Sequence, residues 1–597
     1  MTSLFGLPRD ILGNLTDSRE LVADGERMVE KLKVVGGKDL GEETGRVLDI
    51  FGQTVSDSSH DAVLFTMVTQ LYTIVPVILI VFCQIGFAML QSGASRVESA
   101  AVPFITNILV LVTSCLSFWA VGYALARSDG LTMLGYHQWF SHEFEPKLSI
   151  DWLLHFSLVL TTANIATSGG LERCPIYVNC LLSPIIAGVV AALSDRWAWH
   201  RDSWTMVYSP FQGVAYKDQG GSGVIHMVGG SSALVLSLLL GPRYSRIRDS
   251  RSRILFNDLD GHSLPLELIG WYFCVVCFFC CNCVRLTTTC ITCHSISNTV
   301  ARAVVNSVIS AASASLSTVV FVYLMKTLMG RKRFHYLISR QLANGAVIGI
   351  ISVAAGCDSY PHWAAFVVGL TSAVGYVVWC QVLYFLRIDD PIGVISVHLG
   401  GGLWGVICVT LFREKTGLVF ADQTSVAGLA IVWNVTIAVT MATLSAVLTG
   451  AVLLIPRILD MVPIQHGKEL QGVDVAFLGQ QAYPSGNTVS PFTTDIIEDR
   501  EEFIDSNPAS PQTTVTSPLS YTFSGFRPDN LPAIYDMKNP YEKLEIDLKS
   551  LPSFTRSPGD TDRRVWFSGE SLRDQVAPMT PIIDYSIDSD RWEDIEF

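Results

Sequence analysis

Long apolar stretches, separated by short polar segments, follow one another through the middle of the chain. Each has about 20 residues or more, the length that a helix needs to cross the hydrocarbon core of a bilayer. The pattern therefore predicts an all-α polytopic membrane protein with about eleven transmembrane helices. The predicted spans are 66–90, 101–127, 151–172, 178–199, 222–241, 264–284, 301–328, 338–356, 362–386, 392–413 and 427–456.

Two of these spans open on the same short motif. Segments 218–230 and 390–402 both have an aspartate first, a glycine three positions later, a histidine eight positions later and a closing pair of glycines. The motif indicates two repeats of five spans, followed by one final helix. Because five is odd, the second repeat must be inverted in the membrane relative to the first, and the two motif helices must run antiparallel.

The histidines of the motif, His226 and His398, are the strongest functional candidates. An ionisable side chain inside an apolar span is costly and points to a functional site. The alternative is an ordinary core histidine with satisfied hydrogen bonds. Two histidines in equivalent frames of antiparallel helices favour a shared site at the repeat interface, which is typical of a transport pathway.

Composition agrees with a membrane protein and sets the C-terminal tail apart. Hydrophobic residues make up 49% of the sequence and charged residues 16%, with a mean hydropathy of +0.38, which excludes an ordinary soluble protein of 597 residues. Segment 486–597 is acidic and rich in Ser, Thr and Pro, and we expect it to be disordered because it lacks the apolar residues for a core. The net charge of −13 therefore describes the tail and carries no information on the substrate.

Basic residues set the predicted orientation. The loop after the fifth span carries five arginines between 243 and 253, and the loop after the seventh carries three basic residues at 331–333. Such loops stay in the cytoplasm, so we expect an extracellular N-terminal segment, 1–62, a cytoplasmic C-terminus and a location in the plasma membrane. Asn14 heads a glycosylation sequon in the segment expected outside.

Seven of the 14 cysteines lie between 274 and 293. Cys290 and Cys293, with the histidine that follows, have the spacing of a c-type haem attachment motif, but so short a motif arises by chance. We expect a disulfide on the outer side as an option for this pair, apolar packing roles for the helical cysteines, and no cofactor or metal. The chain shows no nucleophile–base pair or nucleotide motif, so we expect neither an enzyme nor a nucleic-acid partner.

Several motifs resemble those of the ammonium transporters of the Amt/Mep/Rh group, and of the Amt branch in particular. The resemblance extends over about 66–485. Besides the two repeated segments, it is carried by Gly86-Phe87-Ala88-Met89-Leu90 with Gly93, Glu172-Arg173, Ala301-Arg302-Ala303-Val304-Val305-Asn306, Asn344-Gly345 and Ala355-Gly356-Cys357.

The resemblance implies a homotrimer in the lipid bilayer with a narrow pore in each subunit. Ammonium would be recruited at an outer aromatic cage and lose its proton, and ammonia would pass the paired histidines. His226 and His398 match those pore histidines. Asp218 matches a buried aspartate that caps backbone amides beside the recruitment site. Trp199 matches the tryptophan that holds the cation by its π face, although it could also be a plain interfacial aromatic.

Three positions of the outer pore depart from the family pattern. Leu158 and Cys281 replace two gate phenylalanines, and Arg285 replaces the serine that would hydrogen-bond the recruited ion. A guanidinium about 5 Å from a cation opposes its binding by several kcal/mol at an effective dielectric near 20. Two alternatives stay open: a shift of register that puts a threonine of 287–289 in the serine's place, or an Arg285 side chain that extends to the outer surface and leaves a wider entrance.

Beyond the membrane domain, 63–456, segment 457–485 resembles the family's cytosolic tail signature and is expected to couple the tail to the pore. Leu478 stands where the signature has histidine. The matching residues are Gly472, Asp474, Gly479, Ala482 and Tyr483.

We therefore predict transport of ammonium or ammonia through a pore lined by the paired histidines. The altered recruitment site favours two alternatives: a non-conducting ammonium sensor or signalling scaffold that acts through its tail, and a channel for neutral ammonia. The retained histidines favour transport over the sensor, because a closed pore has no use for a polar pair in lipid.

Overall fold

The computed structural model describes residues 41–211, 214–243, 247–250, 253–256, 261–286, 293–329, 338–421, 424–483, 544–546 and 565–567. The chain divides into two compact units, Met1–Asn487 and Thr488–Phe597. In the second unit the described residues are two short antiparallel strands, β3 (Leu544–Ile546) and β4 (Val565–Phe567). The rest of that unit, for which disorder is predicted, lies outside the described residues.

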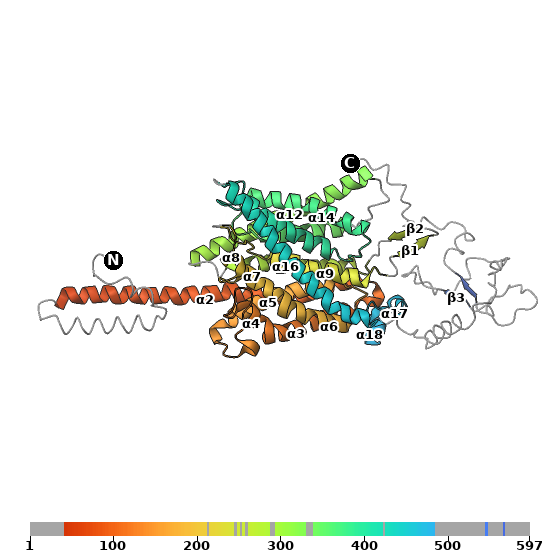
Figure 1. Ribbon diagram of the computed structural model, residues 1–597, viewed down its shortest axis with the longest axis horizontal. Helices are drawn as coiled ribbons and strands as arrows, with labels where there is room; N and C mark the ends of the chain where they lie inside the picture. The colour runs from red at the N-terminus through yellow and green to blue at the C-terminus, as the bar shows by residue number, and fades with distance from the viewer. Residues whose placement is uncertain are drawn as a thin grey trace, which may run out of the picture. The chain divides into compact units, whose positions relative to one another are not determined.

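The first unit is built from long apolar helices that lie side by side (Figure 1). The helices of the first repeat are α2 (Gly41–Ala94), α3 (Val102–Ser117) with η3 (Phe118–Gly122) and α4 (Tyr123–Arg127), α5 (Ser149–Ser168), α6 (Ile176–Ile185) with η6 (Ile186–Val190) and α7 (Ala191–Trp199), and η7 (Ser222–Met227) with α9 (Val228–Leu240). Those of the second repeat are α10 (Leu264–Val284), α12 (Cys293–Met329), α13 (Ile338–Ala354), α14 (His362–Phe385), and η10 (Ile395–Gly400) with α15 (Gly401–Phe412). The final long helix is α16 (Thr424–Ile458).

Shorter elements lie between and after these helices. They are η2 (Val97–Ser99), η4 (Trp139–Ser141), η5 (Pro146–Leu148), α8 (Trp204–Val207), α17 (His466–Gln471), α18 (Val473–Leu478) and the antiparallel strands β1 (Ile247–Ser250) and β2 (Arg253–Phe256). We call the two ends of the bundle the Trp199 end and the tail end, the latter after α17 and α18.

The predicted all-α polytopic class is confirmed. Among the described residues, nine helical segments are long and apolar enough to cross a membrane, and α5 and α13 cover the two remaining predicted spans. Residues 41–62 of the predicted N-terminal segment continue α2 as helix beyond its span, Thr66–Ala94.

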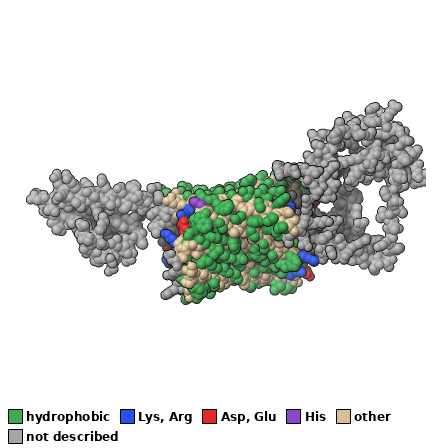
Figure 2. All heavy atoms as spheres, turned by 90° about the horizontal axis from the view of Figure 1, so that it is seen from above, with side chains coloured by type: hydrophobic (Ala, Val, Ile, Leu, Met, Phe, Trp, Pro, Cys, Tyr) green, Lys and Arg blue, Asp and Glu red, His purple; other side chains and the backbone are tan. Residues whose placement is uncertain are grey.

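The outside of the bundle is apolar. Figure 2 shows a face on which hydrophobic side chains cover the middle, while Lys, Arg, Asp, Glu and His side chains gather at the two ends. Leu316 is 67% exposed and Val320 is 62% exposed. Such exposure would be unfavourable in water and is expected where a helix faces lipid.

Candidate functional site

Each repeat begins its motif helix with the same backbone turn. Gly221 has a φ of +88° and Gly393 a φ of +76°, a conformation that glycine adopts without strain. Each glycine follows its motif aspartate by three residues. The aspartate accepts hydrogen bonds from backbone N–H groups that the start of a helix leaves unpaired. The repeated sequence thus produces a repeated helix start.

The two aspartates use their carboxylates differently. Asp218 accepts four backbone N–H groups, two at each oxygen, at 2.8–3.0 Å. Asp390 accepts two backbone N–H groups and a hydroxyl, all at Oδ2. Burial raises the pKa of both carboxyl groups, that of Asp390 to about 6, although the amide donors oppose the shift. The backbone donors to Asp218 are Gly221, Ser222, Gly223 and Val224, and the Tyr216 hydroxyl also donates to its Oδ2 at 3.3 Å. The donors to Asp390 are Ile395 and Ser396.

The structure brings His226 on η7 and His398 on η10 together in the core. Their Nδ1 atoms are 3.0 Å apart, and their rings stack with centroids 5.1 Å apart and planes at 19°. His226 is fully buried and His398 is 5% exposed. A hydrogen bond between two Nδ1 atoms needs one N–H donor and one lone pair, so two neutral imidazoles satisfy it. Burial in this apolar core disfavours an added charge.

The closing glycines of the motif explain why the histidines meet. A Cβ on Gly230 would lie 2.4 Å from the backbone nitrogen of Leu399, and one on Gly402 would lie 2.4 Å from the backbone oxygen of Ser222. Separations this short exclude a side chain at either position. Each repeat therefore has a glycine where the backbone of the other repeat crosses it, and the crossing sets both histidines at one depth.

Phe278 of α10 completes the surroundings of the pair. Its ring contacts His226 and His398 edge to face, at centroid distances of 5.1 and 5.6 Å. Nε2 of His226 is buried and has no hydrogen-bond partner among the described residues. A buried polar atom of this kind can receive a small hydrogen-bonding molecule. Sequence reasoning missed Phe278, because one more aromatic residue in an apolar helix gives no distinct signal.

Trp199, the last residue of α7, contacts the residue that caps the first motif helix. Its Nε1 donates to the backbone oxygen of Asp218 at 2.6 Å. Arg285 follows α10 and places its Cζ 4.0 Å from the centroid of the Trp199 ring, while Nη1 donates to the backbone oxygen of Gln219 at 2.9 Å. Arg285 is only 8% exposed. The alternative in which Arg285 extends to the surface is therefore wrong, because the side chain turns inward onto the indole face.

The other two divergent positions are occupied by small apolar groups. Leu158 and Cys281 are each 1% exposed and belong to the main hydrophobic core. Neither supplies an aromatic face for a cation. The threonines at 287–289, which carried the alternative register, lie outside the described residues.

A buried ionic cluster at the Trp199 end was missed by the sequence analysis. Nδ1 of His155 contacts a carboxylate oxygen of Asp195, and its Nε2 lies 3.5 Å from Oδ1 of Asp151. Arg127 also pairs with Asp151, at 3.2 Å. The His155 ring centroid is 6.3 Å from that of Trp199. A signal was present, since Asp151 and His155 lie one helical turn apart inside an apolar span.

At the tail end, α18 docks on the start of α3 through one carboxylate. Asp474 accepts the backbone N–H groups of Ala101 and Val102, both at 2.9 Å. Gly472 has a φ of +100°, and a Cβ there would lie 2.3 Å from Cβ of Glu98. These two tail-signature residues therefore hold the tail against the membrane domain.

The remaining tail-signature residues follow α18. Gly479 ends the helix with a φ of +69°, Tyr483 pairs its hydroxyl with Nε2 of His262 at 3.2 Å, and Ala482 is half-buried. Leu478, the departure from the signature, packs against a small apolar cluster.

A buried ion network lies next to the docked tail. Arg243 contacts Glu172 at 2.6 Å and Asp389 at 2.9 Å. Arg173 also bonds Asp389, and Arg96 contacts Glu172 at 3.0 Å. The Glu172-Arg173 motif thus serves to tie the helix ends together at the tail end.

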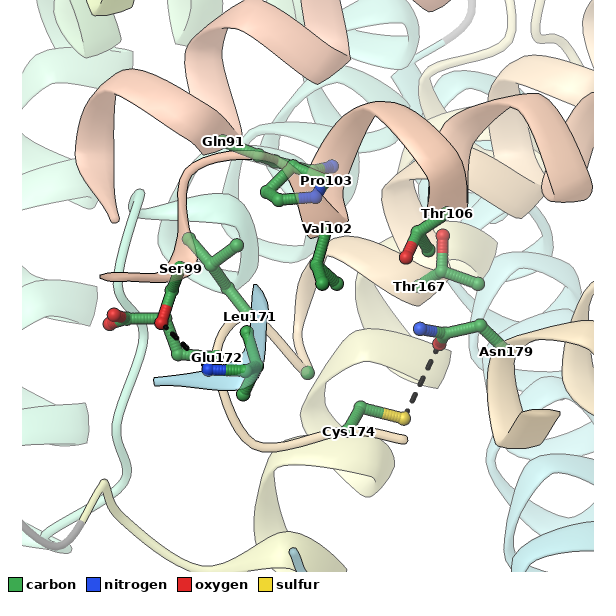
Figure 3. A pocket seen from close by; sticks show the side chains of 12 residues that line it. Gln91, Ser99, Val102, Pro103, Thr106, Thr167, Leu171, Glu172, Cys174 and Asn179 are labelled. Carbon is green, nitrogen blue, oxygen red and sulfur yellow. Dashed lines mark hydrogen bonds between the residues drawn. The ribbon is translucent and has the colours of Figure 1, made fainter. Parts of the chain in front are cut away.

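A small pocket adjoins this network and is separate from the histidine pair. Figure 3 shows the hydroxyls of Thr106 and Thr167 near each other, with the Asn179 amide beside them and Glu172 at the other side of the lining. Asn179 accepts from the Cys174 thiol at 3.4 Å. The pocket belongs to the region where the tail docks.

Some predicted features lie outside the described residues. They are Asn14, Cys290, the side chain of Cys293, the basic residues 331–333 and the acidic clusters of the tail.

The repeated motif helices, the helices long enough to cross a membrane and the apolar surface define a multi-pass membrane protein. Residues 71–483 match the model of the Ammonium Transporter Family, and the chain belongs to this family.

Relatives and solved structures agree with this assignment. The chain is 27% identical over 363 residues to Ammonium transporter Amt2 of Archaeoglobus fulgidus. The aligned region covers 59% of this chain and 73% of that protein. It is 23% identical over 462 residues to Ammonium transporter 1 member 3 of Solanum lycopersicum, covering 73% and 97%. The fold is similar to that of a Sensor Amt Protein, with TM-score 0.60, 21% identity and coverage of 69% and 98%. It is also similar to that of Candida albicans Mep2, with TM-score 0.58, 19% identity and coverage of 70% and 90%.

Proposed function

We propose that the protein moves ammonium or ammonia across the membrane through a pore in which His226 and His398 form the working pair. The observation that carries the proposal is the buried Nε2 of His226, which has no hydrogen-bond partner in the described part of the chain, within a pair whose Nδ1 atoms already bond each other. Ammonia is neutral, small and able both to donate and to accept hydrogen bonds, so it suits this atom.

The low polarity of the core decides which species passes the pair. An unpaired ion buried in an apolar core is strongly disfavoured, whereas a neutral molecule meets no such cost. Ammonium therefore has to give up its proton to the solvent outside the pore, so that ammonia reaches the histidines. Among the described residues, the ring contacts of the two imidazoles are with each other and with Phe278, and these rings supply no counter-charge.

We also propose the assembly and placement that the resemblance implies: a homotrimer in the plasma membrane, with the N-terminus outside and the C-terminus in the cytoplasm. The basic loops at 243–253 and 331–333 support this orientation. Asn14 would then be open to glycosylation, and the Trp199 end would face outward.

The test is ammonia entry into liposomes that contain the purified protein and an internal pH dye. We expect His226→Ala and His398→Ala each to lower the protein-dependent rate at least about tenfold, a loss of about 1.4 kcal/mol or more in the barrier. His362→Ala is a control, because His362 is exposed and bonds Asn306 at 2.7 Å, away from the pair. Unchanged rates in both pair variants would overturn the proposal. A wild-type rate equal to that of empty liposomes would also overturn the proposal. It would favour the alternative of a non-conducting sensor.

A further inference from the structure

Arg285 occupies the face of Trp199 to which a cation would be attracted. The guanidinium carbon lies 4.0 Å from the ring centroid, well inside the distance of about 6 Å over which a cation–π contact acts. The side chain is 8% exposed, so it is buried on the ring and does not lie in open solvent.

Hydrogen bonds fix both partners of the contact between Arg285 and Trp199. Trp199 donates its indole N–H to the backbone oxygen of Asp218, and Arg285 donates to the backbone oxygen of the next residue, Gln219. Both side chains are thereby tied to consecutive carbonyl groups just before the first motif helix. This shared anchor fixes the guanidinium over the ring.

We propose that Arg285 is a tethered cation that takes the place of a recruited ammonium ion on Trp199, and that it makes this pore select neutral ammonia. The inference rests on the proposed transport function. It assigns to Arg285 the role of a specificity-determining residue.

Electrostatics give the direction and size of the effect. A second monovalent cation about 5 Å from the guanidinium would be disfavoured on the order of 100-fold at an effective dielectric near 20. A neutral molecule meets no such repulsion. Nε2 of His226, for which the described ranges contain no hydrogen-bond partner, remains available to the neutral molecule farther along.

The experiment measures ammonium-dependent current and protein-dependent ammonia flux on the same preparations of full-length protein in membranes. We expect the wild type to carry flux without a saturable current. Arg285→Ser should gain a saturable ammonium current at least about tenfold above the wild type, since the repulsion is removed. Arg285→Lys, which keeps the positive charge, should not gain it.

Two further variants locate the effect. Arg302→Ser is the matched control, because Arg302 lies near the start of α12, is 41% exposed in its side chain and pairs with Glu414 at 2.9 Å. It should gain no current. Trp199→Leu added to Arg285→Ser should remove the gained current, because the indole face is the site where the ion would bind.

The outcomes separate the two proposals. A saturable wild-type current that is lost in His226→Ala overturns the role of Arg285 and leaves the proposed transport function standing. A gain of current in Arg302→Ser, or its persistence in the Trp199→Leu double variant, also overturns that role. Absence of both flux and current in the wild type and in Arg285→Ser overturns the transport function itself. Size-exclusion chromatography of each variant checks that it is folded.

Discussion

The two motif helices begin with the same backbone conformation, but different residues flank them. Beside the Asp390 helix, the preceding residue, Asp389, binds Arg173 and Arg243 in a buried ion network. Beside the Asp218 helix, the following residue offers its carbonyl oxygen to Arg285, whose guanidinium lies on an indole ring. One flank ties helix ends together, and the other places a cation near the route to the histidines. The repeated frame therefore builds the histidine pair, and under the proposed function the unrepeated flank with Arg285 would decide which species reaches it.

We expect the largest loss of stability from a side chain added where the two motif helices cross. Gly402→Ala would place a Cβ 2.4 Å from the backbone oxygen of Ser222 and 2.7 Å from the backbone nitrogen of Met227. Since neither backbone atom can move freely, we expect the free energy of unfolding to fall by about 3 kcal/mol or more. Thermal unfolding in detergent measures it. Gly428→Ala on α16 is the control, because no atom of the described residues lies within 4 Å of the added Cβ. Equal destabilisation of both variants would contradict the close backbone crossing.

Substitution of the two motif aspartates should lower stability by a smaller and unequal amount. Asp218→Asn would replace one accepting oxygen by an amide NH2 group, a donor that faces two backbone N–H groups. We expect the free energy of unfolding to fall by about 2 kcal/mol. Asp390→Asn can keep its single accepting oxygen, because Oδ1 has no hydrogen-bond partner among the described residues. We expect a loss of about 1 kcal/mol there. Denaturation of both variants near pH 7 checks the order, and a larger loss in Asp390→Asn would show that the order is wrong.

The smallest expected effect is the dependence of stability on pH that Asp390 contributes. Burial raises the pKa of Asp390 to about 6 from 3.8, so the folded state binds this proton more tightly than the unfolded state. The resulting stabilisation is complete below about pH 4 and is lost as pH rises through about 6. Asp390→Asn lacks this contribution. The difference in melting temperature between wild type and variant should therefore change across this window, and a constant difference from pH 4 to pH 8 would contradict it.

Much of the fold could be predicted from the sequence, because each membrane helix is a run of apolar residues whose length is set by the bilayer. The pairing of His226 and His398 also follows from the repeat, since equivalent positions on antiparallel helices lie at one depth. The role of the closing glycines could not be predicted, because the close backbone crossing that requires them is a tertiary contact.

The Trp199 end was harder to predict. The position of Arg285 in the sequence suggested either repulsion of a cation or an outward side chain, and only the tertiary structure shows its contact with Trp199. The cluster around His155 joins residues from different helices, so spacing alone could not show that Asp195 lies beside it.

If the histidine pair passes neutral ammonia and Arg285 already occupies the cation position on Trp199, the transport rate should follow the ammonia concentration alone. The most direct measurement is wild-type flux into liposomes at two external pH values about one unit apart, with total ammonium adjusted so that the ammonia concentration stays equal while the ammonium concentration changes about tenfold. We expect equal protein-dependent rates under the two conditions, because the rate follows the ammonia concentration. A rate that rises with ammonium and saturates would contradict it.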